Sequence, residues 1–320
     1  MSKRIRIGVV GAGAFAKGMH LPALALQDSV ELTAVANRSV DSARAAAEPF
    51  GIPFCTGDWR ELVARDDVDA VLVTTLPEAR AEVVRASLQA GKPTFSEAPL
   101  ATDAATAKEL AALAKTKGVL TGYAYPVPFL NGGPVLAEAL GQGLIGVPRR
   151  ASLTTHGHGW LHADPAQVWR ARADTRPALL AGLCLGVLVE LFGPLSHIDG
   201  RLERAFDEAD AAPDALDALF ECHSGLRGVV QAGWSPRPTP GHGVHVIGTR
   251  GALTWDWSTG AVSIAEQAGW RELDRGPAPG PAAWRPPVDF VEAALAGTQH
   301  PRDFERAAHE VELAERLALN

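Results

Sequence analysis

Residues 5–16 read IRIGVVGAGAFA, an apolar run that ends in a Gly-x-Gly-x-x-Ala turn. The run predicts a buried β-strand, and the alanine- and leucine-rich residues after it predict a helix. Glycines at such a turn let the backbone approach a pyrophosphate, whose charge the helix N-terminus attracts. An accidental glycine turn is the alternative, but the strand–turn–helix context favours a dinucleotide site. Its predicted contacts are Gly11, Gly13, Ala14, Phe15 and Ala16.

Apolar strands and helical stretches alternate from this turn to residue 125. Strands that alternate with helices of this length predict a parallel, doubly wound sheet, and fully apolar strands indicate a sheet covered on both faces. Further strands are expected at 31–37, 69–75, 93–97 and 119–125, and helices at 40–50, 77–91 and 102–118.

The pattern changes after Tyr125. Residues 126–134, PVPFLNGGP, form a Pro- and Gly-rich boundary, and the later segments between 216 and 257 alternate as in an antiparallel sheet. The sequence therefore predicts an α/β protein with two domains. Residues 1–125 would form a nucleotide-binding domain with a doubly wound parallel sheet. Residues 126–320 would form an α+β domain with a large, mostly antiparallel open sheet.

The composition excludes several classes of protein. The 320 residues are 47% hydrophobic and 21% charged, with a formal net charge of −7. These values are typical of a folded soluble chain, and the lack of a basic excess argues against a nucleic-acid partner. The apolar run from Pro177 to Val189 is shorter than the ~20 residues of a membrane span, so we expect no membrane partner. Three widely spaced cysteines match no metal-ligand pattern and are expected to be reduced thiols in the cytoplasm.

The end of the second strand bears on the choice of cofactor. It reads Ala36-Asn37-Arg38-Ser39, whereas NAD sites usually carry an acidic residue there that binds the ribose 2′-hydroxyl. Arg38 could instead pair with a 2′-phosphate, with Asn37 and Ser39 as hydrogen-bond donors. A solvated surface arginine is the alternative. The pattern predicts a preference for NADP(H), and NAD(H) stays open as the other cofactor.

Several further motifs occur in an order typical of one family. They are IGVVGAGAFA and HLPAL (within 7–24), DWRELVARDDVDAVLVTT (58–75), AGKPTFSEAPLA (90–101), QGLIGVPRRAS (142–152), VWRARAD (168–174), HVIGTRGALTWD (245–256) and DFVEAALAG (289–297). With them the chain resembles the glucose-fructose oxidoreductase / inositol dehydrogenase family (Gfo/Idh/MocA) along nearly its whole length. The resemblance implies a Rossmann domain, a substrate-binding domain with an open sheet, and NAD(P)-dependent hydride transfer at a hydroxyl-bearing carbon. It also implies a homodimer or homotetramer formed through that sheet.

The chain departs from the family pattern where a proton should move. The family's Glu-Lys-Pro reads Glu97-Ala98-Pro99 here, and an alanine side chain neither donates a hydrogen bond nor transfers a proton. The run 177–189 lacks the family's Asp and His-x-x-Asp residues, and Arg80 stands where the family has a histidine. The remaining cofactor contacts implied by the resemblance are Thr74, Thr75, Leu76, Arg80, Glu97 and Ala98.

Other side chains could supply the proton. Tyr125, more than Tyr123, is a candidate, because both share one face of a strand that ends at the carboxyl edge of the sheet. His156 and His158 share one face of the strand that by resemblance approaches the nicotinamide. The alternatives are packing for the tyrosines and an ordinary polar sheet face for the histidines. A zinc site that included His162 is conceivable, but no acid or cysteine lies at motif spacing, so we expect no metal.

The sequence thus predicts an NAD(P)-dependent oxidoreductase with an atypical proton donor, acting on a carbonyl, imine or hydroxyl carbon. Trp160, Trp169 and Arg170 would form an aromatic wall and an anion clamp. Such a wall favours an aromatic or carboxylate-bearing small molecule slightly over a neutral sugar. The alternative from another class is a dinucleotide-binding sensor or partner subunit without turnover, which Ala98 motivates. A cofactor-retaining lyase or hydrolase is a third option that the missing lysine disfavours.

Overall fold

The chain forms two compact units. The computed structural model describes residues 4–128, 130–158, 176–205, 213–235, 241–274 and 280–319. The first unit contains residues 1–125 and 280–311, and the second contains residues 126–279 and 312–320. The sequence-based boundary after Tyr125 lies at the first crossing between them, but the C-terminal segment 280–311 groups with the first unit instead of the second.

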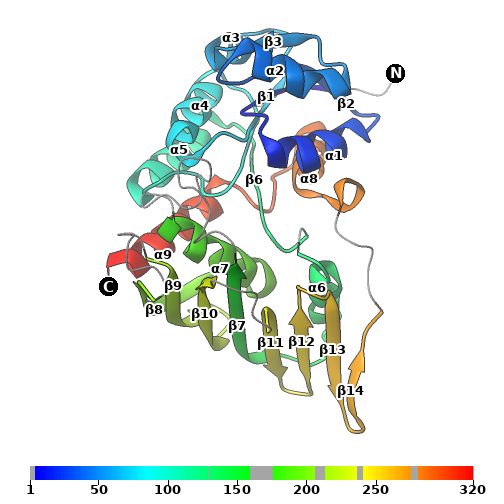
Figure 1. Ribbon diagram of the computed structural model, residues 1–320, viewed down its shortest axis with the longest axis vertical. Coiled ribbons are helices and arrows are strands. Elements are labelled where there is room, and N and C mark those ends of the chain that lie inside the picture. Colours follow the sequence, from blue (N-terminus) through cyan, green and yellow to red (C-terminus); the bar gives the residue numbers. More distant parts are fainter. Residues whose placement is uncertain are drawn as a thin grey trace. The chain divides into compact units, whose positions relative to one another are not determined.

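The first unit is built on a six-stranded parallel sheet with the strand order β3-β2-β1-β4-β5-β6. Figure 1 labels β1, β2, β3 and β6 of this sheet. Parallel neighbours require crossover connections, which the alternating helices supply. The strands are β1 (Ile5–Val10), β2 (Val30–Ala36), β3 (Phe54–Thr56), β4 (Ala70–Val73), β5 (Thr94–Ser96) and β6 (Thr121–Tyr123). The helices are η1 (Ala16–His20), α1 (Leu21–Ala25), α2 (Val40–Ala47), η2 (Glu48–Phe50), α3 (Trp59–Val63), α4 (Pro77–Gln89), α5 (Ala104–Lys117), η4 (Pro281–Ala283), α8 (Pro286–Ala296) and α9 (Phe304–Leu319).

Helices cover both faces of this sheet because its strands are apolar on both sides. Val9 and its neighbours pack against α1, α2 and α8 on one face. Val10 and its neighbours pack against α3, α4, α5 and the first half of α9 on the other. Residues 280–311 join this unit because Phe290 and Phe304 complete its two cores. The doubly wound sheet expected from the sequence is confirmed, although β3 and α3 are too short to show a periodicity that would predict them.

The second unit is built on an eight-stranded sheet with the order β14-β13-β12-β11-β7-β10-β9-β8. β7 and β10 are parallel and the other neighbours are antiparallel, which confirms the mostly antiparallel sheet. The strands are β7 (Pro148–His158), β8 (Leu195–Glu203), β9 (Ala215–Cys222), β10 (Arg227–Ser235), β11 (Gly243–Gly248), β12 (Ala252–Asp256), β13 (Ala261–Glu266) and β14 (Gly269–Glu272). The helices are α6 (Gly133–Gly141) and α7 (Arg176–Phe192).

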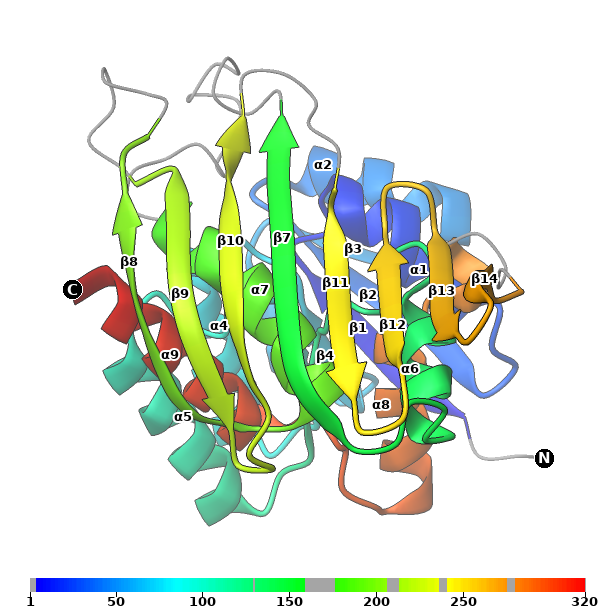
Figure 2. The same ribbon diagram turned by 90° about the horizontal axis from the view of Figure 1, so that it is seen from below.

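One face of this second sheet is open in the part of the chain that the structure describes. Figure 2 shows its strands in front of α7, with no helix on the side toward the viewer. Burial alternates accordingly along β7, where Leu153 is buried whereas Ser152 and Thr154 are partly exposed. An antiparallel sheet with one covered and one solvated face alternates in this way.

Helix α7 lies in the core of the second unit. Its apolar residues, Cys184 among them, pack with side chains of β9 and β10. Burial raises the pKa of the Cys184 thiol to about 12, so this cysteine acts as a small apolar side chain. Among the described residues, no helix is both long and apolar enough to cross a membrane.

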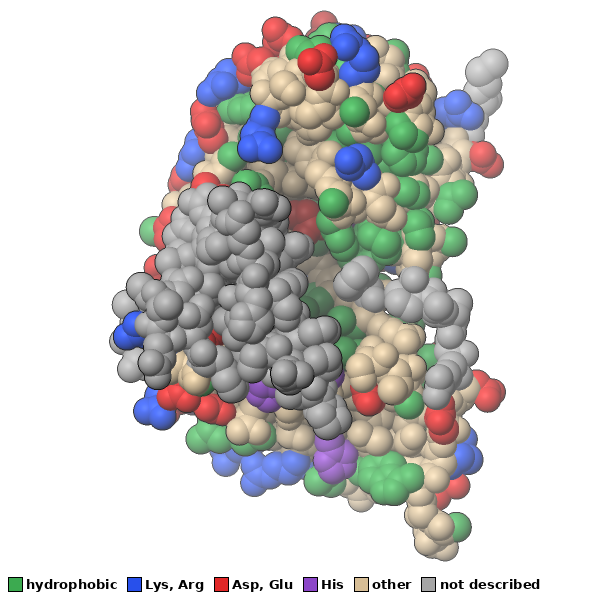
Figure 3. Space-filling model, in the orientation of Figure 1, with side chains coloured by type: hydrophobic (Ala, Val, Ile, Leu, Met, Phe, Trp, Pro, Cys, Tyr) green, Lys and Arg blue, Asp and Glu red, His purple; other side chains and the backbone are tan. Residues whose placement is uncertain are grey.

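Charged side chains of both signs are interspersed on the surface of the first unit. Figure 3 shows this in its upper half, where Lys and Arg lie among Asp and Glu without a large patch of one sign. Ion pairs such as Arg60–Glu82 (2.6 Å) and Arg85–Glu109 (2.5 Å) form part of this pattern. On this face, therefore, no concentrated positive field is available to a polyanion.

Candidate cofactor-binding and proton-transfer site

Gly11 closes the turn between β1 and the first helix. Its φ of +88° lies in the left-handed region, and a Cβ there would stand 2.6 Å from the backbone nitrogen of Thr75. The Gly11 amide donates to the Ala36 carbonyl (2.8 Å), and Thr74 Oγ1 donates to the Gly11 carbonyl (2.8 Å). The ends of β1, β2 and β4 are thus joined at a position that requires glycine.

Two further residues of the turn are exposed to solvent. Gly13 and Ala14 are exposed, and a Cβ on Gly13 would meet no heavy atom nearer than the Gly11 carbonyl oxygen, 3.8 Å away. Phe15 is partly buried and Ala16 fully buried, where the helix packs against the sheet. An open backbone at a helix N-terminus fits a pyrophosphate, so these residues could hold a nicotinamide dinucleotide.

The loop after β4 borders this turn. Thr74 is hydrogen-bonded to the turn, and Leu76 is 39% exposed at the start of α4. The buried Thr75 Oγ1 has no hydrogen-bond partner among the described residues. Buried hydroxyls normally find partners, so Thr75 is a candidate contact for a bound ligand.

Arg38 is the exposed cation at the end of β2. Asn37 Nδ2 donates to the Ser42 carbonyl (3.0 Å), and Ser39 Oγ accepts the Ser42 amide proton (3.2 Å) as the N-cap of α2. These two polar side chains are therefore engaged in starting the helix. No hydrogen bond or ion pair to another described residue is found for the Arg38 side chain, which is available for a 2′-phosphate.

The first helix contains a π-helical segment, η1, before the α-helix resumes at Leu21. A π turn inserts an extra residue and shifts the side chains that follow it, and such turns are frequent at functional sites. His20, the last residue of η1, is fully buried. The motif HLPAL gives no signal of a functional role for His20, because the partners of this side chain are distant in the sequence.

His20 links Glu97 to Trp284. Its Nε2 lies 2.5 Å from Glu97 Oε1, and the Trp284 indole N–H donates to His20 Nδ1 at 3.1 Å. Because an indole nitrogen only donates, Nδ1 carries no proton, and Nε2 therefore donates its proton to the carboxylate. Phe15 and Phe95 contact the imidazole edge-on, with ring centroids 5.3 and 5.7 Å away. The ring is held in one tautomer and one orientation.

Glu97 directly follows β5, at the carboxyl edge of the sheet where ligands of doubly wound folds bind. Its side chain is 20% exposed. Burial raises the pKa of Glu97, but the hydrogen bond from His20, with the positive charge that a protonated His20 and Arg80 place beside it, outweighs burial and lowers the pKa below its ordinary value. Glu97 is therefore a carboxylate at neutral pH. Ala98 beside it is exposed, and its methyl group has no exchangeable proton.

Arg80 lies beneath this edge. Its side chain is 2% exposed, and its guanidinium donates to the carbonyl oxygens of Pro99 and Thr75. Burial lowers the pKa of Arg80 to about 10, so the group stays charged at neutral pH. The resemblance implies a direct cofactor contact, whereas these bonds join the loop after β4 to the loop after β5. A direct contact of Arg80 with a cofactor stays a prediction.

The two tyrosines differ in environment. Tyr123 is 2% exposed in the core beside α9, and burial raises its pKa, which makes it a poor proton donor. Tyr125 is partly buried, and its hydroxyl donates to Asp289 Oδ2 at 2.7 Å. Asp289 also accepts from Arg285 at 2.8 Å. The hydroxyl proton of Tyr125 is thus engaged with α8.

His156 lies on the open face of the sheet in the second unit, alternating with the buried Thr155. Its backbone N–H donates to His242 Nδ1 at 3.0 Å, and burial lowers the pKa of the His156 imidazole. The side chain of His158 and the predicted substrate contacts Trp160, Trp169 and Arg170 lie outside the described residues. Within the described ranges, no group of three or more His, Cys, Asp or Glu side chains is placed to hold a metal ion.

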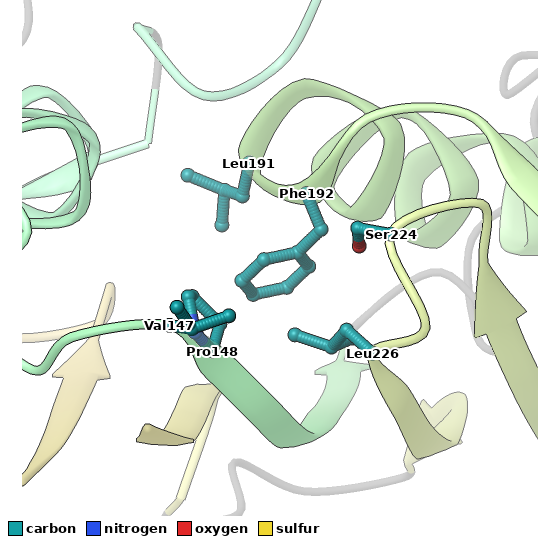
Figure 4. Close-up of a pocket in the computed structure, with 6 residues that line it drawn as sticks. All are labelled: Val147, Pro148, Leu191, Phe192, Ser224 and Leu226. Atoms are coloured by element: carbon teal, nitrogen blue, oxygen red, sulfur yellow. The ribbon is translucent and has the colours of Figure 1, made fainter. Parts of the chain in front are cut away.

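A pocket of about 190 Å³ lies at the C-terminal end of α7 in the second unit (Figure 4). It is lined by Val147, Pro148, Leu191, Phe192, Ser224 and Leu226. The lining is apolar apart from the Ser224 hydroxyl, and it includes no ionisable side chain. The pocket could take up a small apolar group, but it has no acid or base for catalysis.

Comparison with known sequences places the chain among oxidoreductases. The model of a family described as "Oxidoreductase family, NAD-binding Rossmann fold" matches residues 5–125. The chain is 34% identical over 195 residues to dTDP-3,4-didehydro-2,6-dideoxy-alpha-D-glucose 3-reductase of Actinomadura kijaniata, covering 59% of this chain but only 58% of that relative. It is 30% identical over 267 residues to the protein of the same name from Streptomyces violaceoruber, covering 79% of this chain and 73% of the relative.

Solved structures share the fold. An oxidoreductase from Agrobacterium radiobacter in complex with NAD⁺, L-tartaric acid and magnesium has a TM-score of 0.85 at 16% identity, covering 99% of this chain and 97% of that one. A 3-ketoreductase from Actinomadura kijaniata in complex with NADP has a TM-score of 0.76 at 23% identity, covering 98% and 97%. With the match to the Streptomyces relative, the chain belongs to the Gfo/Idh/MocA oxidoreductase family, as its sequence motifs indicate.

Proposed function

We propose that this protein is an NAD(P)-dependent oxidoreductase that moves a hydride to or from a carbonyl, imine or hydroxyl carbon of a small molecule. The observation that carries this function is the open glycine turn, where the exposed Gly13 and Ala14 leave room for a pyrophosphate. A bound nicotinamide would supply or accept the hydride. Relatives named as a 3-reductase and a 3-ketoreductase support a carbonyl substrate.

NADP(H) is the proposed cofactor, with NAD(H) as the alternative. The exposed Arg38 at the end of β2 supports this choice, because a guanidinium can pair with the 2′-phosphate that NAD lacks. The relatives do not decide between the two, since one solved structure holds NADP and another NAD⁺.

The proton-transfer group of this oxidoreductase would differ from the family lysine, whose position Ala98 takes. The hydrogen bond from Tyr125 to Asp289 favours a structural role for that tyrosine. Candidates from the sequence remain Tyr125, His156 and His158 for proton transfer, and Trp160, Trp169 and Arg170 for substrate contact.

A cofactor-binding sensor or partner subunit is the second candidate function. Ala98 supports it directly, because a protein that has lost its proton-transfer residue can retain the cofactor site. The two functions differ in one measurable property, since only the oxidoreductase changes the redox state of its cofactor.

We also infer a homodimer or homotetramer formed through the open sheet face of the second unit. Leu219 and Val229 pair across β9 and β10 and are 60% and 42% exposed, and Ile247 on β11 is 45% exposed. Exposed apolar side chains on one sheet face support association with a second copy. A cytoplasmic location is supported by the three cysteines, which are all free.

One assay tests these functions. The purified protein is mixed with NADPH or NADH and a panel of ketones, imines and keto acids, and the dihydronicotinamide absorbance is followed. The matching alcohols are assayed with the oxidised cofactors, and calorimetry measures cofactor binding. Turnover of any substrate supports the oxidoreductase, and tight binding without turnover favours the sensor. Absence of binding by either cofactor rejects both functions.

A further inference from the structure

Glu97 is both anchored and accessible at the carboxyl edge of the parallel sheet. Its Oε1 accepts the Nε2 proton of His20 at 2.5 Å, and its Oε2 lies 3.3 Å from the Ala98 backbone nitrogen. The Glu97 side chain is 20% exposed, whereas Arg80 and Tyr123 near the same edge are each 2% exposed. A substrate at this edge could therefore reach the carboxylate of Glu97 but not these two buried groups.

We propose that Glu97 is the catalytic proton-transfer residue of this protein, and that His20 and Trp284 are positioning residues that hold it. The proposal rests on the oxidoreductase function proposed above. Glu97 stands one residue before Ala98 and would perform the proton transfer that an alanine cannot.

In the direction of oxidation, the Glu97 carboxylate accepts the proton of a substrate hydroxyl. The O–H and C–H bonds break, the O–H electron pair forms the C=O bond, and the C–H electron pair leaves as a hydride that reduces the oxidised nicotinamide. Protonated Glu97 then releases its proton to solvent. In the direction of reduction, protonated Glu97 gives its proton to the carbonyl oxygen as the hydride arrives.

His20 itself is not suited to receive this proton. Its Nδ1 lone pair accepts the Trp284 indole proton at 3.1 Å, and its Nε2 already carries the proton that it donates to Glu97. A second proton on the ring would face the indole N–H and break that bond. Trp284 therefore holds the His20 ring in one orientation, and His20 holds one oxygen of Glu97 while the rest of the carboxylate stays partly exposed.

The charges around Glu97 determine the expected pH dependence. The titratable groups that face it are His20 from η1, Arg80 from α4 and Tyr123 from β6. Burial raises the pKa of Glu97, and the His20 hydrogen bond, with the positive charge of a protonated His20 and of Arg80, lowers it below the ordinary value. Glu97 is thus ready as a base at neutral pH. Reduction needs its protonated form and should speed up by about tenfold per pH unit on acidification.

Glu97→Gln tests the proton transfer with little change of shape. The amide oxygen can still accept the His20 proton, but the amide cannot take up a proton at these pH values. We expect kcat to fall about 10²–10⁴-fold. NADP(H) binding, measured by calorimetry, should persist, because the amide keeps the hydrogen bond from His20 at a position that the resemblance also counts among the cofactor contacts. Glu31→Gln makes the same chemical change at an exposed glutamate on β2 and should leave both quantities at the parental value. Formate should restore part of the activity of Glu97→Ala, because it supplies a carboxylate in the vacated space.

Trp284→Phe tests the positioning role with a readout that needs no cofactor. The phenyl ring fills much of the indole space but has no N–H, so His20 Nδ1 becomes free to bind a proton. In cofactor-free protein, ¹⁵N NMR should show the Nε2–H tautomer of His20 in the parent and, in the variant, a protonation step on acidification that the parent lacks. The variant's oxidation rate should fall through the same step, because a charged His20 makes Glu97 a weaker base. Loosened packing alone would create no such step.

The outcomes separate this proposal from the oxidoreductase function. Parental turnover by folded Glu97→Gln would overturn the role of Glu97 and leave the oxidoreductase standing. A parent that binds NADP(H) but converts no substrate would overturn both. Should Glu97→Gln fail to fold, a parental reduction rate that stays constant from about pH 8 to about pH 6 would still contradict Glu97 as the proton donor. Detection of the Nδ1–H tautomer of His20 in the parent would overturn the positioning role.

Discussion

The two sheets of this protein offer different surfaces to their surroundings. The parallel sheet of the first unit is covered by helices on both faces, so its accessible groups, such as Gly13, Arg38 and Glu97, lie at strand ends. The sheet of the second unit is covered on one face, and the other exposes Leu219 and Val229. A doubly covered sheet therefore confines its accessible groups to the strand ends, whereas a half-covered sheet leaves one whole face exposed to a partner.

The largest expected effect tests whether the two faces of the second sheet really differ. Phe220 and Leu219 are neighbours on β9, 3% and 60% exposed. Phe220→Ala should lower the free energy of unfolding by about 3–5 kcal/mol, because it opens a cavity in the core. Leu219→Ala should change it by less than about 0.5 kcal/mol in the monomer. Chemical denaturation at low protein concentration measures both, and equal losses would mean that the face bearing Leu219 is covered.

A measurement of the oligomeric state tests whether the exposed face of the second sheet forms the proposed interface. Leu219→Asp should shift the protein toward the monomer in light scattering, because it places a charge in the proposed interface. Asp199 faces Leu219 across β8 and β9, so the new charge would also be repelled within one sheet. An unchanged oligomer would exclude this face from the interface.

The glycine turn tests the strand ends of the first sheet. Gly11→Ala should destabilise the protein by about 1–3 kcal/mol and abolish cofactor binding, because its φ is positive and the new Cβ would meet Thr75. Gly13→Ala should cost little stability, since the new Cβ would meet no protein atom nearer than the Gly11 carbonyl oxygen at 3.8 Å. It should weaken cofactor binding, because the methyl group would occupy space that the pyrophosphate needs. Gly18→Ala, with nothing within 4 Å, is the control for both. Equal cofactor affinities in all three variants would place the cofactor elsewhere.

Arg38→Asp tests the cofactor choice at the end of β2. The change should weaken NADP(H) binding by about 1–3 kcal/mol, because it replaces a charge-assisted contact to the 2′-phosphate with a repulsion. The ratio of the NAD(H) affinity to the NADP(H) affinity should therefore rise. Arg44→Asp, an exposed arginine on α2, makes the same charge change as a control. Equal parental affinities for NADP(H) and NAD(H) in calorimetry would contradict the preference.

Tyr125→Phe has the smallest expected effect and separates two roles. It removes only the hydroxyl that donates to Asp289, so stability should fall by about 1 kcal/mol or somewhat more. If Glu97 transfers the proton, kcat should stay near the parental value. A tenfold or greater fall in kcat with unchanged cofactor affinity would instead support Tyr125 as the donor.

Much of the fold could be predicted because it depends on local sequence patterns, namely the periodicity of apolar residues and the spacing of glycines. The alternating strands and helices of the first unit follow from periodicity, and the glycine turn follows from a motif whose spacing reflects backbone geometry. The open sheet face follows from the period of two along strands such as β7. The departure at Ala98 is likewise visible in the letters alone.

The site beyond the glycine turn depended on contacts between distant residues. His20 and Glu97 are 77 residues apart, and Trp284 and His20 are 264 apart. A π-helical turn and the return of residues 280–311 to the first unit bring the three side chains together. Neither feature leaves a periodic signal in the sequence.

The type of each sheet, the glycine turn and the family can therefore be inferred from the amino-acid sequence, because strand periodicity and tight turns depend on residues close in the chain. The burial of Arg80, the hydrogen bond from Tyr125 to Asp289 and the contact between Glu97 and His20 appear only in the folded chain. The physical reason is that a side chain's protonation and accessibility depend on its neighbours in space. Those neighbours are set by how separate helices pack, which no local pattern specifies.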